Sequence, residues 1–148
     1  MNAPLNLPDY EPRLRMSPSS HLEEIWDPQR MKWVRLTPEE WVRQHFVNFL
    51  INHHGYPAGR IGNEVQIQVG QLGRRCDTVV FGHEGEPVMI VEYKSPAVKI
   101  TQKVFDQIAV YNMQLNVPYL IVSNGLQHYM CQVDRESKRY IFSKKLDY

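Results

Sequence analysis

Two acidic residues in the middle of the sequence stand where both could contact one metal ion. Residues 74–94, RRCDTVVFGHEGEPVMIVEYK, hold two apolar runs separated by glycine and proline, which predicts a β-hairpin. We take Phe81 to face Val88 across this hairpin. Counting along an antiparallel ladder then places Asp77 directly opposite Glu92. Opposed residues have Cβ atoms roughly 4.5 to 5.5 Å apart, which lets both carboxylates reach the same ion.

The predicted pair needs a compensating charge, because two carboxylates beside an apolar layer repel each other. Lys94 supplies one positive charge on the same strand face as Glu92. Mg²⁺ and Mn²⁺ prefer oxygen ligands, so Asp77, Glu92 and the backbone carbonyl of Tyr93 form a candidate partial metal shell. The alternative is a surface ion pair between Glu92 and Lys94 at a strand end. The apolar run before Glu92 and the matching Asp77 favour the metal site.

The arrangement of Asp77, fourteen intervening residues and then Glu92-Tyr93-Lys94 resembles the PD-(D/E)xK nuclease superfamily. Within it, the chain is most similar to the N-terminal nuclease domain of type I restriction enzyme restriction subunits and its standalone relatives, over roughly residues 26–132. The resemblance implies a restriction-endonuclease-like core, Mg²⁺-dependent hydrolysis of phosphodiester bonds and a nucleic acid substrate. Cys76 stands where the motif's name has proline, a departure that puts little in doubt, since that proline is often missing in relatives.

A first helix is predicted to begin at residues 37–40, TPEE, which offer a capping residue, proline at the first helical position and glutamate at the third. Apolar residues follow at helical spacing as far as Gly55. At about 100° per residue, Glu39 falls near the apolar stripe and Glu40 on the far side, where it serves the capping box. The resembling family has a glutamate four residues before an arginine here, as Glu39 precedes Arg43, which implies that Glu39 assists at the metal. The alternative is a first-turn carboxylate favoured by the helix dipole.

Three arginines are candidate contacts to nucleic acid. Arg43 lies on the first helix, whereas Arg74 and Arg75 enter the strand of Asp77, where they could hold phosphate. Solvated arginines at a strand end are the alternative for Arg74 and Arg75. The 17 lysines and arginines against 16 acidic residues give a net charge of +1, so any contact with DNA must be local.

A second helix is predicted from Thr101 to Asn116, because its apolar residues share one helical face. Gln107 and Tyr111 lie four residues apart and are neighbours on that helix. Their spacing resembles the Q-x-x-x-Y element that many of these nucleases carry after the E-x-K strand. The resemblance implies that they position the phosphate or Lys94; packing with hydrogen bonding on a half-buried helix face is the alternative.

The remaining pattern predicts an α/β fold, an α+β mixed sheet with a restriction-endonuclease-like core in the order α-β-β-β-α-β and a C-terminal hairpin. Residues 64–69 alternate as a half-exposed strand, and residues 119–123 form a buried strand parallel to its predecessor. Residues 128–133 and 140–142 form the closing hairpin. The 148 residues fit a single nuclease domain at 21–148 behind an extended or flexible arm at 1–20, which holds four prolines.

Several classes of protein are disfavoured. Cys76 and Cys131 lack the spacing of a zinc cluster or a disulfide framework and fit a reducing cytoplasm. No apolar run is long enough to cross a membrane, and the start of the chain lacks a secretory signal pattern. The chain also lacks a P-loop, so an ATP-driven motor, like a specificity subunit, would be a separate partner.

These observations predict an endonuclease that uses Mg²⁺ or Mn²⁺ to hydrolyse DNA, in restriction, defence or DNA processing. The rival hypothesis is a non-catalytic nucleic-acid-binding or assembly module that retains the nuclease fold. The small size of the chain and its near-zero net charge favour that rival.

Overall fold

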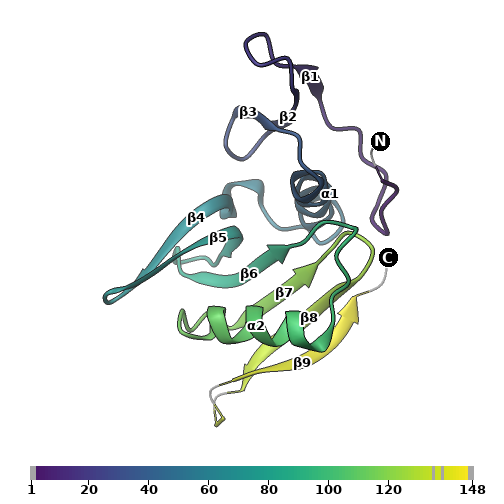
Figure 1. The fold of residues 1–148 in the computed structure, drawn as a ribbon. Helices are drawn as coiled ribbons and strands as arrows, with labels where there is room; N and C mark the ends of the chain where they lie inside the picture. Colours follow the sequence, from purple (N-terminus) through teal and green to yellow (C-terminus); the bar gives the residue numbers. More distant parts are fainter. Residues whose placement is uncertain (1–2, 135, 138, 147–148) are drawn as a thin grey trace.

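The central feature of the fold is a mixed sheet with one helix packed on each face (Figure 1). The computed structural model describes residues 3–134, 136–137 and 139–146, with the backbone alone for residues 143–146. Within these residues there are a six-stranded sheet and a separate three-stranded antiparallel sheet. In the described part of the chain, no helix is long and apolar enough to span a membrane.

The elements, in chain order, are β1 (Leu14–Met16), β2 (Glu23–Asp27), β3 (Lys32–Arg35), α1 (Pro38–Asn52), a 3-10 turn (Ala58–Arg60), β4 (Ile61–Val69), β5 (Leu72–Phe81), β6 (Pro87–Tyr93), α2 (Gln102–Met113), β7 (Tyr119–Ser123), β8 (His128–Asp134) and β9 (Arg139–Leu146). From α1 onward the helices and strands follow one another in the predicted order, whereas the three strands before α1 were not predicted. The large sheet has the strand order β4-β5-β6-β7-β8-β9, and only the pair β6 and β7 is parallel among its described ladders. Helix α2 makes the crossover between these two strands. The predicted mixed α/β fold with its α-β-β-β-α-β core and C-terminal hairpin is therefore confirmed.

Both helices begin at side-chain caps. The Thr37 hydroxyl accepts a hydrogen bond from the Glu40 N–H at 3.1 Å, and Pro38 occupies the first turn. The Thr101 hydroxyl accepts from the Val104 N–H at 3.2 Å. These caps fix where each helix starts and therefore which residues it turns toward the sheet.

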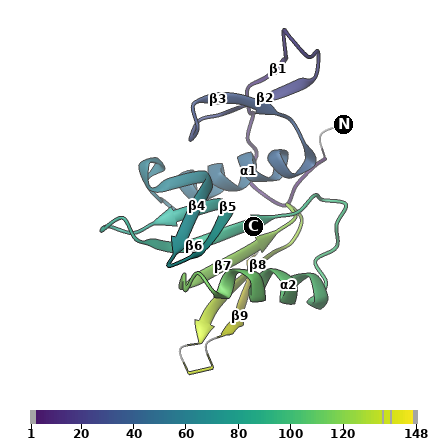
Figure 2. The ribbon, with the colours of Figure 1, turned by 60° about the vertical axis from the view of Figure 1, so that its left-hand side comes forward.

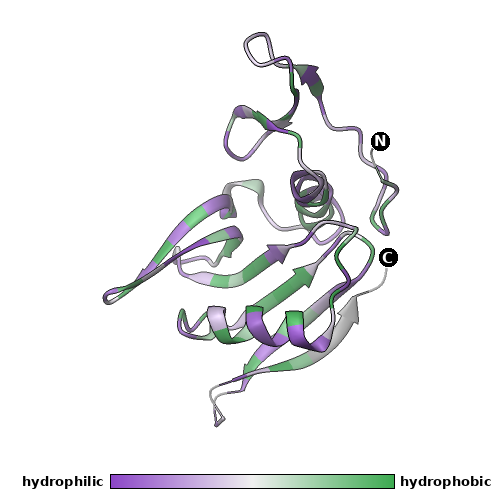
Figure 3. Cartoon of the chain, in the orientation of Figure 1, coloured by the Kyte–Doolittle hydropathy of each residue, from purple (hydrophilic) through white to green (hydrophobic). Residues whose placement is uncertain are grey.

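Alternating residues of the central strands build two apolar layers, and Figure 3 shows these strands as the most hydrophobic part of the sheet. The layer beneath α1 includes Val80, Val91 and Ile121. The layer beneath α2 includes Val79 and Ile90. Neighbouring residues of one strand thus serve opposite cores, so the direction of each polar side chain at the strand ends is also fixed.

The hairpin of β4 and β5 changes face part of the way along its length. In β4, Ile61 packs on the α1 side and Ile67 on the α2 side, although uninterrupted alternation would put both on one face. The change occurs at Glu64, whose φ of 56° lies in the left-handed region, and the ladder skips Glu64 and Asp77. The outer part of the hairpin, including Arg74, is thereby turned toward α2.

The N-terminal residues form a small sheet against α1, on the side away from the large sheet (Figure 2). The predicted arm contains β1, which pairs with β2, so a boundary at residue 20 divides this sheet. The arm also wraps around the domain, because Leu7 is buried in the α1-side core and the Asn6 N–H donates to the Gly125 carbonyl at 2.8 Å. Helix α1 is consequently covered on two sides.

Candidate active site

Asp77 and Glu92 lie on adjacent strands at the point where β5 and β6 separate. The last paired residues are Thr78 and Val91, so the predicted register places Asp77 and Glu92 next along the two strands. Beyond that pair the Asp77 side chain replaces the backbone ladder, since its Oδ2 accepts a hydrogen bond from the Tyr93 N–H at 2.9 Å. The predicted adjacency of the two carboxylates is therefore confirmed.

The same ladder corrects one detail of the predicted hairpin. Phe81 lies opposite Pro87 rather than Val88, because the register shifts between Val80 and Phe81. The shift lies on the turn side of the hairpin. It therefore leaves the pairing near the carboxylates unchanged.

Glu92 is a carboxylate in an unfavourable place for a negative charge. It is only 7% exposed. Burial, and then the nearby charge of Asp77, raise the pKa of Glu92 to about 8, although Arg74 opposes the rise. The site thus resists having both carboxylates ionised at once, and a bound cation would relieve that resistance.

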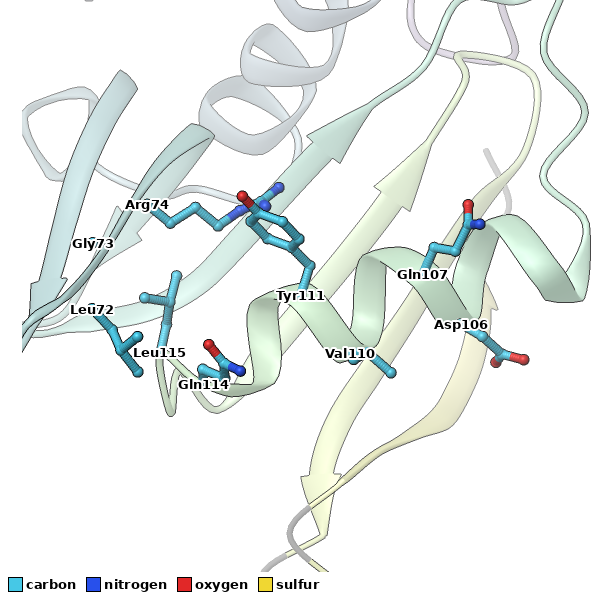
Figure 4. Close-up of a pocket in the computed structure, with 9 residues that line it drawn as sticks. All are labelled: Leu72, Gly73, Arg74, Asp106, Gln107, Val110, Tyr111, Gln114 and Leu115. Atoms are coloured by element: carbon cyan, nitrogen blue, oxygen red, sulfur yellow. The ribbon is translucent and has the colours of Figure 1, made fainter.

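Arg74 is the cation that the structure places on Glu92. Its Nη2 donates to Glu92 Oε1 at 3.1 Å, and its guanidinium carbon lies 3.6 Å from the centre of the Tyr111 ring. Figure 4 shows the guanidinium against this ring. Its Nε is buried and finds no hydrogen-bond partner among the residues that the structure describes. The change of face at Glu64 is what brings Arg74 to the α2 side.

Two residues of α2 complete the surroundings. Gln107 and Tyr111 line a cavity of about 250 Å³ together with Arg74 and Lys94. They also line an adjoining hollow of about 740 Å³ between α2 and the hairpin of β4 and β5, drawn in Figure 4. Lys94 is half-buried and has no ion pair in the described part of the chain. The structure therefore gathers Lys94, Gln107 and Tyr111 around one cavity, which is also lined by the arginine that pairs with Glu92.

The predicted orientation of the first-turn glutamates of α1 is wrong. Glu39 is exposed, whereas Glu40 is 5% exposed and receives a hydrogen bond from Arg30 at 2.9 Å. The phase argument assumed one buried stripe on α1. The N-terminal sheet covers a second side of the helix, so the residue expected to face solvent is the buried one.

Arg43 is also placed differently from its prediction as a contact to DNA. It is 7% exposed and donates to Glu40 Oε1 at 2.9 Å and to Glu64 Oε1 at 2.7 Å. It also donates to the Asp77 carbonyl at 2.5 Å. Burial disfavours its charge, but the bonds and charges of Glu40 and Glu64 raise the pKa of Arg43 above its ordinary value. Arg43 therefore holds the backbone of Asp77 from behind.

Arg74 and Arg75, neighbours in sequence, have separate surroundings. The Arg75 side chain is 69% exposed, and its Nε lies 3.2 Å from Glu64 Oε2. Arg74 bonds Glu92 instead, as described above. Arg75 is thus open to a phosphate, whereas Arg74 is held inside the site.

Sequence reasoning missed a buried polar network that joins the N-terminal sheet to the large sheet. Asp27 is fully buried and accepts hydrogen bonds from Arg30 and from the Asn63 side chain. Although burial favours its neutral form, these bonds hold the pKa of Asp27 below its ordinary value. The one local signal was the spacing of Glu40, Arg43 and Gln44, which suits pairing three and four residues apart on a helix.

The donor chemistry beside β6 suits a hard divalent cation. Asp77 and Glu92 offer carboxylate oxygens, and the Tyr93 carbonyl faces Asp77 because the N–H of the same strand residue does. Within the described residues, no group of three or more His, Cys, Asp or Glu side chains is arranged to hold a metal. Water and a substrate oxygen would complete the shell, as Mg²⁺ ordinarily allows.

Comparison with known proteins agrees with this geometry. A family model described as the type I restriction enzyme R protein N terminus matches residues 38–146. The matched span runs from the first residue of α1 through the large sheet and leaves β1 to β3 outside. A search of curated proteins found no match. The predicted resemblance is confirmed and associates the chain with restriction systems: this protein belongs to the family of type I restriction enzyme R protein N-terminal domains.

Proposed function

We propose that this protein is a Mg²⁺-dependent endonuclease that hydrolyses phosphodiester bonds of DNA in a restriction or DNA-processing system. The observation that supports this best is the pair of Asp77 and the buried Glu92 on adjacent strands, with Lys94 two residues beyond Glu92. Two neighbouring carboxylates repel each other when both are ionised, and a bound cation removes that repulsion. Family membership raises the expectation that the cation serves nuclease chemistry.

Each residue has a role that follows from its position. Asp77, Glu92 and the Tyr93 carbonyl would hold Mg²⁺ or Mn²⁺. The ion would supply Lewis acidity and lower the pKa of a bound water. Lys94 would orient the attacking water and offset the charge that develops on the scissile phosphate.

The residues around the cavity would bind the substrate. Gln107 and Tyr111 would position the phosphate or the Lys94 ammonium, since all three line the same cavity. Arg75 would contact the DNA backbone from the exposed face of the hairpin. A separate motor or specificity subunit would supply translocation and sequence choice.

The direct test is cleavage by the pure protein of duplex, single-stranded and branched DNA with Mg²⁺ or Mn²⁺. We expect Asp77→Ala and Lys94→Ala to lose cleavage by at least about a hundredfold, a typical size for loss of a catalytic group. Glu84→Ala is the matched control, because Glu84 is an exposed carboxylate in the turn of the same hairpin. Cleavage that survives Asp77→Ala would come from a contaminating nuclease.

A non-catalytic nucleic-acid-binding or assembly module is the second candidate. It is favoured by the contact between Arg74 and Glu92, which already places a positive charge on one of the two carboxylates. This candidate predicts salt-sensitive DNA binding without cleavage, and Lys94→Ala would leave that binding unchanged. Cleavage lost in Asp77→Ala but retained in Glu84→Ala would rule it out.

A further inference from the structure

Arg74 occupies a position that a metal ion would compete for. We infer that Arg74 neutralises Glu92 in the free protein and moves from it to a DNA phosphate when metal and DNA bind, so that it couples the two ligands. This inference rests on the proposed function, because it assigns Arg74 a role at the same site. It concerns how metal and DNA depend on each other, which the proposed roles leave open.

The competition follows from the contact itself. Arg74 Nη2 lies 3.1 Å from Glu92 Oε1, and an ion that binds this oxygen would lie about 2.1 Å from it. Two positive charges would then be a few ångströms apart in a largely buried site, where their repulsion is strong. The metal and the guanidinium therefore disfavour each other on Glu92.

The surroundings of Arg74 offer its side chain a second position. Its side chain is 19% exposed and lies on the Tyr111 ring, beside the cavity that Lys94 and Gln107 also line. The Tyr111 ring offers a surface on which the guanidinium stays favourable after it leaves Glu92. Rotation of the Arg74 side chain toward this cavity would free the carboxylate.

The unpaired Nε leaves a donor available to an anionic ligand, which in the proposed function is a DNA phosphate. A guanidinium binds a phosphate best through two parallel N–H groups, and Nε is one of the two that such a fork commonly uses. In the free protein this Nε is buried without a partner among the described residues, although Nη2 is bonded to Glu92. A DNA phosphate in the cavity would satisfy both groups at once.

The consequence is reciprocal cooperativity. Metal binds weakly while Arg74 holds Glu92, and DNA that draws Arg74 away strengthens metal binding. By linkage, metal strengthens DNA binding by the same factor. A free protein with a blocked site would also not load metal far from its substrate.

The first experiment measures Mn²⁺ binding to the intact protein without DNA, by electron paramagnetic resonance or calorimetry. We expect Arg74→Gln to bind Mn²⁺ about tenfold tighter than the wild type, the size expected for loss of one competing charged hydrogen bond. Arg75→Gln is the matched control, because it removes the neighbouring arginine on the other side of the hairpin, and it should match the wild type. Arg74→Lys keeps a positive charge and should remain weak. Equal affinity in Arg74→Gln and the wild type would overturn the inference.

The second experiment adds duplex DNA in a Lys94→Ala background, so that the DNA stays intact. We expect DNA to raise Mn²⁺ affinity about tenfold in Lys94→Ala and less than about twofold when Arg74→Gln is added. Circular dichroism and melting curves establish that both variants are folded. An equal effect of DNA in the two backgrounds would overturn the inference.

Glu92→Gln separates this inference from the proposed function. Mn²⁺ binding that is lost in Glu92→Gln yet indifferent to Arg74 would leave the metal site standing and remove only the role of Arg74. If neither the wild type nor Arg74→Gln binds Mn²⁺, with or without DNA, the proposed function and the inference are both overturned.

Discussion

The two sides of the large sheet treat buried charge in opposite ways where β5 and β6 separate. On the α1 side, Arg43 lies between Glu40 and Glu64, and each charge has an opposite partner within 3.0 Å. On the α2 side, Arg74 pairs with Glu92, and burial together with the charge of Asp77 raises the pKa of Glu92. The closed network fixes the backbone of Asp77, whereas the open pair keeps a repulsion that a ligand can relieve.

The difference follows from what covers each side. The N-terminal sheet lies over α1 and supplies Arg30 to Glu40, so that network is shielded and complete. The α2 side borders two cavities lined by Arg74, Gln107 and Tyr111. The α1 side thus contributes to stability, whereas the α2 side remains available for binding.

The largest effect should come from opening the closed network. Arg43→Met should lower the free energy of unfolding by roughly 3 to 5 kcal/mol, because it leaves the buried Glu40 and the partly buried Glu64 without the arginine that they share. Urea denaturation measures the change. Arg75→Met should cost less than about 1 kcal/mol, since Arg75 forms an exposed ion pair. Equal losses in the two variants would contradict the distinction between the faces.

The next effect concerns pH on the open side. The pKa of Glu92 is about 8 in the folded, metal-free protein and close to 4.5 when unfolded, so the folded state binds more protons between these values. Stability should therefore be greatest at low pH in this window and fall as pH rises toward 8, by up to about 1.4 kcal/mol per pH unit.

Glu92→Gln isolates that contribution. The variant should lack this part of the slope and be more stable than the wild type at pH 9 in the presence of a chelator. Chemical denaturation of both proteins from pH 5 to 9 tests the prediction. Parallel profiles would mean that Glu92 titrates at an ordinary pKa.

A divalent cation should stabilise the folded protein only when both Asp77 and Glu92 are present. Free Mn²⁺ at ten times its Kd should add about 1.4 kcal/mol of stability. For a domain of this size the Tm should rise by roughly 3 to 6 °C. Glu92→Gln should show no rise in a melting experiment. A Tm indifferent to millimolar Mn²⁺ in both the wild type and Arg74→Gln would count against the metal site.

The smallest effect should come from Glu39, the glutamate first expected at the metal. Because Glu39 is exposed in the first turn of α1, Glu39→Gln should lose only the helix-dipole contribution of about 0.3 to 1 kcal/mol. Its Mn²⁺ affinity should equal that of the wild type by calorimetry. A weakened Mn²⁺ affinity would restore Glu39 to the metal site.

The elements of the large sheet were predictable because their signals are local. Periodicity, the caps at Thr37 and Thr101 and the turn after Phe81 depend on neighbouring residues. The adjacency of Asp77 and Glu92 followed from counting along one hairpin. The shift at Phe81 did not, because it depends on how the turn closes.

The errors share a physical cause, which is contact between distant segments. Glu40 is buried and bonded to Arg30, which lies in the turn between β2 and β3, and these short strands have little recognisable pattern in the sequence. Arg43 was expected to contact DNA. Its acidic partner Glu64 lies on a strand 21 residues away, so the sequence alone did not reveal that this arginine is already paired. Arg74 faces α2 because the hairpin changes face at Glu64, where φ is positive. A glutamate in the left-handed region cannot be recognised from the sequence.

The N-terminal sheet determines how far this protein can be truncated from its N-terminus and still fold. A fragment limited to residues 38–146 would start at the first helical residue and lose the cap that Thr37 provides. It would also remove Ile25 and Asp27, both fully buried, and take Arg30 from Glu40. The smallest piece expected to fold is therefore larger than the span by which the family is recognised, and expression boundaries should be set before β1.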